Sequence, residues 1–325
     1  MVNMLALLDY LSDGDFHSGE DIAALFKVSR TAIWKQIKKL NAMLPCEIAS
    51  VSGKGYQLTE SLAVLKTDTI LFYTEKSLHS ELHQVEVLLE CVSTNQYLLD
   101  KVEDGCLENY LLLAELQTAG RGRRGRQWIS PFASNIYMSL SWGLAISISQ
   151  MAGLSLVVAI SIAVAMRNHG IENIKLKWPN DVYVDGRKLA GILLELRGES
   201  NSPCRAVMGI GINVNMPQQA GDCIDQLWVD MKSLLGASVN RNKVIGSVLN
   251  ELIPNLKLFE DKGFIAFIER WKEFDLLENK VVDISGHASL TSGIARSVDS
   301  QGALVVEFEK KTHHIYSGEV SIRLS

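Results

Sequence analysis

Four arginines and three glycines alternate within one short stretch of the chain, which reads GRGRRGRQW from Gly120 to Trp128. Guanidinium groups bind phosphate oxygens, and glycine allows the backbone to approach a ligand closely. Such a stretch could form a dinucleotide-binding turn, a nucleic-acid-binding arm or a loop that closes over a small phosphorylated ligand.

The residues that follow this stretch argue against a dinucleotide-binding turn. That turn opens a helix and is followed about 20 residues later by an acidic residue that binds a ribose hydroxyl. Here Pro131 and a strand-like alternation follow, and no Asp or Glu occurs from Leu116 to Ile171. A nucleic-acid arm is usually terminal, whereas this stretch lies between apolar segments. We expect a loop that folds over a small phosphorylated ligand, with a solvated surface loop as the alternative.

Two further groups of polar residues have ordinary structural interpretations. Ser93, Thr94 and Asn95 precede a helical pattern, where these residue types commonly cap the helix. Lys188 follows Asp185-Gly186, a favourable two-residue hairpin turn, and a lysine in such a strand is usually on the surface. Residue type alone therefore does not distinguish a binding role from a cap or a surface position.

Composition limits the class of protein. The chain has 325 residues, 47% of them hydrophobic and 21% charged. These values are typical of a soluble protein of two or three domains. Its formal net charge of −5 excludes a uniformly basic nucleic-acid-binding protein, so any polyanion must meet a local positive patch. The longest apolar run extends from Met151 to Met166. A membrane span needs roughly 20 residues, so this run is too short. We expect a buried helix there and no membrane association.

The cysteines and the N-terminal segment indicate a cytoplasmic protein. The chain has five cysteines, an odd number, and no pair with C-x-x-C spacing. This usage favours reduced thiols and disfavours a zinc site. The N-terminal segment lacks the basic flank of a signal peptide.

The first sixty residues predict a winged helix-turn-helix. Ser18 and Asp21 have capping-box spacing before a short helix over 22–26, and Ser29 can cap a third helix whose inward face repeats at Ile33 and Ile37. Two short strands around Lys54 would form the wing. Six Lys or Arg and one acidic residue occur from Lys27 to Lys54, which favours DNA binding over an ordinary three-helix domain. The expected DNA contacts are Ser29, Arg30, Thr31, Trp34, Lys35, Lys38 and Lys54, with Trp34 either contacting bases or packing into the wing.

The rest of the chain predicts a mixed sheet followed by a small β-barrel. Several apolar runs, some joined as hairpins, favour a mixed sheet backed by helices over a regular β-α-β series. The predicted strands lie within 110–116, 136–142, 174–178, 182–184, 189–196 and 206–214. The last fifty residues alternate in short strands with glycines at their turns, which is typical of a small barrel.

Four separated motifs then coincide: STNQYLLD at Ser93, QTAGRGRRGRQW at Gln117, KWPNDVYVDGRKLAGILLE at Lys177 and GIGINVN at Gly209. Together they closely resemble the biotin protein ligases. With the N-terminal domain, nearly the whole chain resembles their bifunctional class, the biotin operon repressors. The resemblance implies an α+β fold with three domains: a winged helix-turn-helix over 1–64, a mixed-sheet catalytic domain similar to class II aminoacyl-tRNA synthetases over 65–276, and an SH3-like barrel over 277–325. The segment from Ser317 to Arg323 resembles the closing strand of that barrel.

The resemblance also implies a two-step reaction and a regulatory role. Biotin and ATP, accompanied by Mg²⁺, would give biotinyl-5′-AMP and pyrophosphate, and the biotin would then pass to a lysine of a biotin carboxyl carrier protein. Biotinyl-AMP would act as corepressor by promoting a homodimer that binds the biotin operator. This chain is not itself the carrier, because Met231-Lys232 is followed by Ser233 and so lacks the Met-Lys-Met setting.

The family's functional residues can be matched one by one. Lys188, Arg121 and Arg123 match catalytic positions, with Lys188 expected between the biotin carboxylate and the α-phosphate. The positions that match biotin-binding residues are Ser93, Thr94, Asn95, Gln117, Arg121, Gly122, Arg123, Lys188 and Gly191. Those that match ATP- or adenylate-binding residues are Arg123, Arg124, Trp128, Lys177, Asn180, Asp181 and Asn213, with Asp181 also a candidate Mg²⁺ ligand. A lipoate or octanoate ligase and a non-catalytic ligand-sensing transcription factor remain as alternatives.

Overall fold

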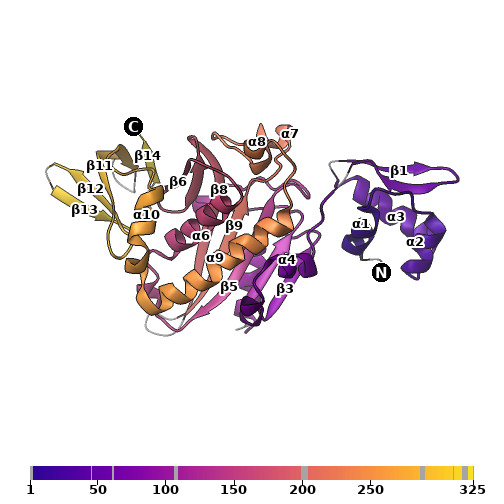
Figure 1. Cartoon of the computed structure of the whole chain (residues 1–325), viewed down its shortest axis with the longest axis horizontal. Helices are drawn as coiled ribbons and strands as arrows, with labels where there is room; N and C mark the ends of the chain where they lie inside the picture. The colour runs from indigo at the N-terminus through magenta and orange to yellow at the C-terminus, as the bar shows by residue number, and fades with distance from the viewer. Residues whose placement is uncertain are drawn as a thin grey trace.

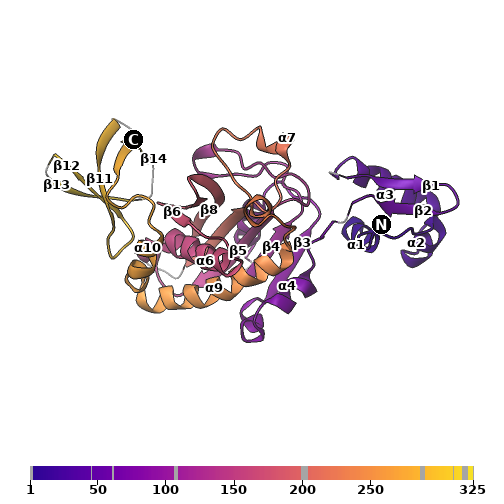
Figure 2. The same cartoon turned by 45° about the horizontal axis from the view of Figure 1, so that its top comes forward.

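A computed structural model describes residues 3–44, 46–60, 62–105, 109–198, 204–285, 290–309, 311–316 and 321–324. Three parts follow one another along the long axis: an N-terminal helical domain, a large central sheet with its helices, and a small C-terminal sheet (Figure 1). The turned view in Figure 2 shows the same order, with the N-terminal domain joined to the centre by a single connection.

The N-terminal domain is a winged helix-turn-helix, as predicted. Its elements are α1 (Met4–Leu11), α2 (Gly19–Leu25), α3 (Arg30–Asn41), β1 (Ile48–Val51) and β2 (Gly55–Leu58), and the two strands pair antiparallel. The prediction of a second helix over 22–26 was wrong at its start. The helix begins at Gly19 because the Ser18 hydroxyl accepts a hydrogen bond from the Asp21 backbone N–H at 3.0 Å, which is the usual cap of a helix N-terminus.

Seven strands form the central sheet in the order β3-β4-β5-β9-β8-β7-β6. Their bounds are β3 (Gln84–Leu88), β4 (Tyr110–Ala114), β5 (Ile136–Leu144), β6 (Ile174–Lys177), β7 (Asp181–Val184), β8 (Arg187–Arg197) and β9 (Cys204–Ile212). Only the β3–β4 pair is parallel, so the predicted mixed sheet is confirmed. The predicted hairpin turn is also confirmed, since Asp185 and Gly186 have φ of 47° and 75° between β7 and β8. Positive φ at both central residues is what a tight hairpin turn of this kind requires.

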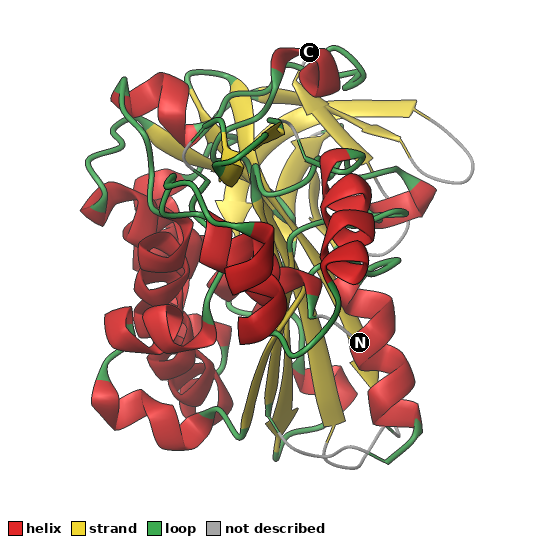
Figure 3. Cartoon of the chain, turned by 90° about the vertical axis from the view of Figure 1, so that its right-hand side faces the viewer, coloured by secondary structure: helices red, strands yellow, loops and turns green. Residues whose placement is uncertain are grey.

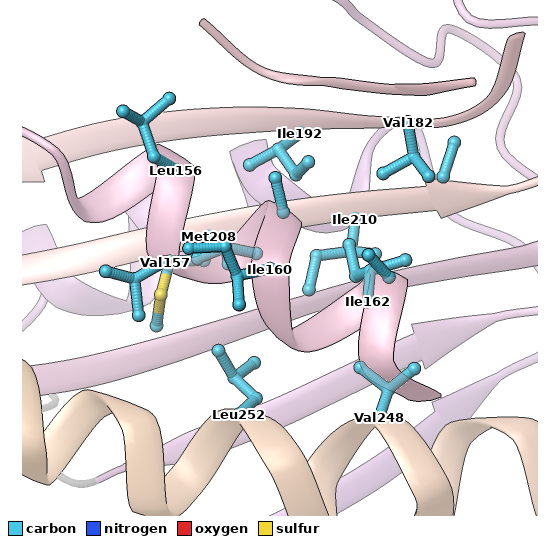
Figure 4. Close-up of a cluster of buried hydrophobic side chains, with 14 of the residues drawn as sticks. Leu156, Val157, Ile160, Ile162, Val182, Ile192, Met208, Ile210, Val248 and Leu252 are labelled. Carbon is cyan, nitrogen blue, oxygen red and sulfur yellow. The ribbon is translucent and has the colours of Figure 1, made fainter. Parts of the chain in front are cut away.

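Helices cover both faces of this sheet. α6 (Leu154–Asn168) and α9 (Arg241–Lys262) pack on one face, and α5 (Thr94–Glu103) packs on the other against β4, β5 and β9. In Figure 4, α6 and α9 lie side by side in front of the strands, and Ile162 of α6 lies near Ile210 of the sheet and Val248 of α9. The apolar run from Met151 is therefore the buried helix that was predicted.

The remaining helical segments connect these elements. In a view toward the N-terminal domain, the strands of the large sheet run up the middle between helical segments (Figure 3). The connecting segments are α4 (Thr67–Tyr73), η1 (Lys76–Glu81), η2 (Arg123–Gly125), η3 (Ile148–Gln150), α7 (Gln218–Gly221), α8 (Met231–Leu235), η4 (Phe264–Phe267) and α10 (Ile268–Phe274). No helix in the described ranges is both long and apolar enough to cross a membrane.

The C-terminal part is an antiparallel sheet in the order β13-β12-β11-β10-β14. Its strands are β10 (Val281–Ser285), β11 (Leu290–Val298), β12 (Leu304–Phe308), β13 (Lys311–Ile315) and β14 (Ser321–Leu324). β13 and β14 are its edges, so the sheet is open over the described residues. Of the predicted closing segment, 317–320 lie outside those residues, and 321–323 belong to β14, which pairs with β10.

Candidate functional site

One pocket on the central sheet collects almost all of the predicted ligand-binding residues. It lies between the start of α5, the arginine loop over 120–128, the β6–β7 connection and strands β8 and β9. The predicted residues that line it are Ser93, Thr94, Asn95, Gln117, Arg121, Gly122, Arg123, Arg124, Trp128, Lys177, Asn180, Asp181, Lys188 and Gly191. Asn213 lines an adjoining cavity that shares Trp128, Lys177 and Lys188 with this pocket.

The start of α5 supplies both a helix cap and the polar side of the pocket. The Ser93 hydroxyl accepts from the Gln96 backbone N–H at 3.5 Å, while Ser93 also lines the pocket. The Thr94 backbone N–H and hydroxyl both donate to Gln117 Oε1, at 2.9 and 3.1 Å. Gln117 Nε2 donates in turn to Ser130 at 3.1 Å. The cap interpretation and the binding-site interpretation therefore hold together.

The arginine loop is a tight hairpin, and two of its four arginine side chains have hydrogen-bond partners on neighbouring elements. The Gly122 N–H donates to Arg126 O at 2.7 Å, and Arg124 at the tip has a φ of 58°. The Arg121 guanidinium donates to Gln96 Oε1 at 2.6 Å, and Arg123 donates to Asn180 Oδ1 at 3.3 Å. Only a short 3-10 turn follows Gly122, so the helix that a dinucleotide-binding turn would open is absent from this described segment.

Arg123 is a partly buried cation of this loop. Burial lowers the pKa of the Arg123 guanidinium, and the neighbouring Asp181 carboxylate opposes that effect. An arginine stays charged at neutral pH even so. A poorly solvated guanidinium beside the pocket interacts strongly with an anionic ligand, because water screens it less.

Lys188 is held from its side chain and its backbone. Its Nζ lies 2.8 Å from Asp181 Oδ1, and the two side chains are only 12% and 20% exposed. The Lys188 backbone N–H donates to Leu227 O at 2.9 Å, and its carbonyl accepts from Val229 N at 3.0 Å and from Asn213 Nδ2 at 3.3 Å. Asn213 therefore contributes here by fixing the segment that carries Lys188.

Trp128 lies over two glycines of the sheet. A Cβ at Gly211 would overlap the indole ring, and one at Gly191 would come within 3.0 Å of it. Lys188 Nζ lies 5.5 Å from the ring centroid. The buried Trp128 Nε1 has no hydrogen-bond partner among the described residues. Buried donors are normally paired, so this unpaired N–H against Gly211 is an exception.

Sequence reasoning missed several residues that shape this pocket. Gln96 holds Arg121, Ser130 holds Gln117, and Gly211 makes room for Trp128. The closely spaced glycines of GIGINVN were a signal for Gly211. Gln96 and Ser130 gave no comparable signal, because their types and local spacing do not indicate their partners.

The predicted DNA-contacting residues are all on the surface of the N-terminal domain. Ser29, Arg30, Thr31, Trp34, Lys35, Lys38 and Lys54 are all exposed. Ser29 also caps α3 by accepting from Ala32 N at 3.2 Å. Trp34 is 51% exposed, and Lys38 Nζ lies 5.5 Å from its ring centroid. The indole therefore presents a large apolar surface to solvent on the basic side of α3.

The His, Cys, Asp and Glu side chains of the described residues are dispersed. Within the described ranges, no three His, Cys, Asp or Glu side chains form a group that could hold a metal ion. Cys46, Cys91, Cys204 and Cys223 are free thiols, and Cys106 lies outside the described residues.

Comparison with known proteins gives the same three parts. Residues 88–213 match the biotin/lipoate A/B protein ligase family, residues 3–57 match an HTH domain, and residues 281–323 match the biotin protein ligase C terminal domain.

Two curated relatives extend this match to nearly the whole chain, and one solved structure matches three quarters of it. The bifunctional ligase/repressor BirA of Salmonella typhimurium is 38% identical, with 98% of this chain and 97% of the relative covered. BirA of Escherichia coli is 37% identical over the same shares. The structure of biotin protein ligase from Aquifex aeolicus in complex with biotin and ATP superposes with a TM-score of 0.63 at 28% identity, covering 75% of this chain and 100% of that one. The chain therefore belongs to the family of bifunctional biotin ligases and repressors.

Proposed function

We propose that this protein is an ATP-dependent biotin protein ligase that also represses transcription as a DNA-binding protein. The observation that carries the proposal is the convergence of three groups in one pocket: the polar start of α5, the arginine loop and Lys188. Each group meets one demand of the first reaction. The start of α5 can orient the polar ring of biotin, the arginine loop can bind the phosphates, and Lys188 can stabilise the negative charge that develops in the transition state.

In the first step, a biotin carboxylate oxygen attacks the α-phosphorus of ATP, the bond to the β-phosphate oxygen breaks, and pyrophosphate leaves. Ser93, Thr94, Asn95 and Gln117 line the side of the pocket suited to the ureido ring. Lys188 lies where its ammonium group can stabilise the carboxylate and the α-phosphate together. Asp181 Oδ1 holds the Lys188 Nζ at 2.8 Å. The cation is therefore already oriented before substrates bind, which is what makes such a group effective in the transition state.

The nucleotide part of the ligand is assigned to the side of the pocket formed by the arginine loop and the β6–β7 connection. Arg121 and Arg123 are proposed to bind phosphate oxygens, and Trp128 to pack near the adenine. Gly122 and Gly191, which match biotin-binding positions, are proposed to allow close approach of the backbone to the biotin part of the ligand. The other proposed adenylate-side residues are Arg124, Lys177, Asn180, Asp181 and Asn213.

Mg²⁺ is proposed to enter with ATP. This ion prefers phosphate oxygens with one or two protein carboxylates. The Asp181 carboxylate in the pocket fits that donor set. Asp181 would hold the ion, which would neutralise charge on the phosphates.

In the second step, the ε-amine of a lysine on a biotin carboxyl carrier protein attacks the carbonyl of biotinyl-AMP. An amide forms, AMP leaves, and the amine loses a proton. The nucleophile thus comes from the partner protein.

For repression, we propose that biotinyl-AMP promotes a homodimer whose two winged domains bind two half-sites of the biotin operator in the cytoplasm. The basic exposed face of α3 and the wing supports DNA contact. We propose domain limits of 1–64, 65–276 and 277–325, an SH3-like C-terminal domain and a catalytic domain similar to class II aminoacyl-tRNA synthetases. The three matched ranges, 3–57, 88–213 and 281–323, support these limits.

The decisive experiment is pyrophosphate–ATP exchange with biotin, lipoate or octanoate as the acid, followed by mass spectrometry of a carrier domain. Exchange that depends on biotin, and addition of biotin to one carrier lysine, are expected. Exchange that depends only on lipoate or octanoate would show the related ligase activity. Binding of biotin without any exchange would show a ligand-sensing transcription factor.

A further inference from the structure

A serine outside the pocket connects two of the residues that line it. Ser139 lies on β5, is fully buried and is not part of the pocket lining. Its hydroxyl oxygen is 2.6 Å from Asn95 Oδ1 and 2.8 Å from Thr94 Oγ1. It therefore lies directly behind the first turn of α5, at the point where that turn meets the sheet.

The orientation of the Asn95 amide is fixed by its other contacts. Its Nδ2 donates to Glu195 Oε2 at 2.9 Å and to the Leu193 carbonyl at 3.2 Å. A carboxylate and a carbonyl only accept hydrogen bonds, so the amide nitrogen must face them. Asn95 Oδ1 consequently faces Ser139. The sheet leaves space for this amide at Gly209, where a Cβ would overlap Asn95 Oδ1.

The protons in this network can be counted. Three contacts run in series, from Asn95 Oδ1 to Ser139, from Ser139 to Thr94, and from Thr94 to Gln117 Oε1. The two end groups are acceptors, and the two hydroxyls between them supply only two protons. Asn95 Oδ1 can only accept, so the Ser139 proton goes to it, and the single Thr94 proton then serves either Ser139 or Gln117. In both arrangements the Thr94 proton is engaged, so Thr94 Oγ1 has a lone pair left for the pocket.

We propose that Ser139 is a positioning residue of the biotin site. It holds Thr94 and Asn95 so that Thr94 Oγ1 presents a hydrogen-bond acceptor to the pocket, and this acceptor selects a ligand ring that carries an N–H donor, as the ureido ring of biotin does. The inference rests on the proposed function and adds the group that sets the chemical preference of that site. Without the Ser139 hydroxyl, Asn95 Oδ1 loses its donor, and Gln117 Oε1 is left as the partner of the Thr94 hydroxyl.

Ser141 provides a matched control. It lies two residues further along β5 on the same face, is 1% exposed, and accepts from Arg205 Nη1 at 3.3 Å. Ser139→Ala should raise the KM for biotin about tenfold in pyrophosphate–ATP exchange, the effect of leaving a buried acceptor without its donor. The kcat and the KM for ATP should change less than about twofold. Ser141→Ala should change none of these values.

A ligand analogue tests the selectivity directly. Wild-type protein should have a much higher kcat/KM for biotin than for biotin methylated on one ureido nitrogen. Ser139→Ala should bring these two kcat/KM values closer together. Ser139→Cys, which keeps a weak donor in a similar volume, should give an intermediate KM for biotin and serves as the second variant if the alanine protein does not fold. A folded Ser139→Ala or Ser139→Cys protein with the wild-type KM and the wild-type discrimination would overturn the proposal. Wild-type protein that shows no exchange with biotin would instead contradict the proposed function.

Discussion

Arg241 Nη1 lies 2.7 Å from Glu115 Oε2, and the two side chains are 3% and 0% exposed. This buried ion pair holds the connection between the N-terminal domain and the central sheet. Arg241 Nη2 donates to Ala63 O at 2.7 Å, and Glu115 Oε1 accepts from Leu65 N at 2.7 Å. Asn242 donates to Val64 O at 3.0 Å and accepts from Lys66 N at 2.8 Å. The connection is therefore fixed by the central domain over several residues.

Arg241→Met should destabilise the protein by about 3–5 kcal/mol, because it leaves the Glu115 carboxylate buried without its cationic partner. Urea unfolding measures the change. The control is Arg296→Met, which removes an ion pair with Glu307 whose side chains are 40% and 45% exposed. That substitution should cost no more than about 1 kcal/mol. Equal losses of unfolding free energy in the two variants would show that burial does not increase the contribution of the Arg241–Glu115 pair.

Lys188→Ala should lower biotin-dependent pyrophosphate–ATP exchange by about 100-fold to 1000-fold, as expected for loss of one preoriented group that stabilises transition-state charge. The measurement is the exchange rate at saturating biotin and ATP. Arg187→Ala is the matched control, because Arg187 is the adjacent cation on β8 and is exposed. An exchange rate near wild type in Lys188→Ala would remove Lys188 from the reaction.

Gly211→Ala should displace Trp128 from the sheet, since the added Cβ would overlap the indole ring. A shift of this size beside reacting groups can cost about 100-fold in rate. The exchange rate and the tryptophan emission maximum, which should move to longer wavelength, report the two effects. Gly143→Ala in β5 is the control, because its nearest neighbour is the flexible end of Arg205 at 3.0 Å. Unchanged emission and exchange in Gly211→Ala would show that Trp128 does not need this position.

His169 should make stability depend on pH below the ordinary pKa of histidine. Burial, and to a lesser degree the positive charge of Lys243, lowers the pKa of His169 below 6.5. As the pH falls below 6.5, the unfolded chain therefore binds a proton at His169 more readily than the folded protein does. The stability that the neutral His169 side chain contributes is present above pH 6.5 and is lost as the pH falls below it. His169→Gln should show less loss of stability between pH 7.5 and 5.5 in urea unfolding. Parallel pH profiles for the two proteins would contradict this assignment.

Local patterns predicted the elements and family motifs predicted the pocket, but neither predicted the contacts between distant segments. The α3 helix follows from a cap at Ser29 and inward residues at Ile33 and Ile37, all within a few turns. In contrast, Arg241 and Glu115 are 126 residues apart, so nothing near either one indicates the pair. The β3 strand was missed because Gln84–Leu88 is a short segment without a fully buried residue. The role of Ser139 depends on α5 crossing β5, which only the tertiary structure defines.

In the N-terminal domain, substitutions at two neighbouring residues should affect electrostatic binding of DNA and recognition of its sequence separately. Lys35 is an exposed cation on α3, whereas Trp34 presents an indole that is 51% exposed. In the presence of biotin and ATP, Lys35→Ala should reduce the slope of log affinity against log salt by about one for any duplex, since one phosphate contact is lost. Trp34→Ala should keep that slope but lose preference among duplexes selected from a random library, because apolar contacts to base edges carry sequence information. Lys76→Ala, which removes an exposed charge from the central domain, should change neither property. If Trp34→Ala selected the same sequences as wild type, the indole would have no part in recognition.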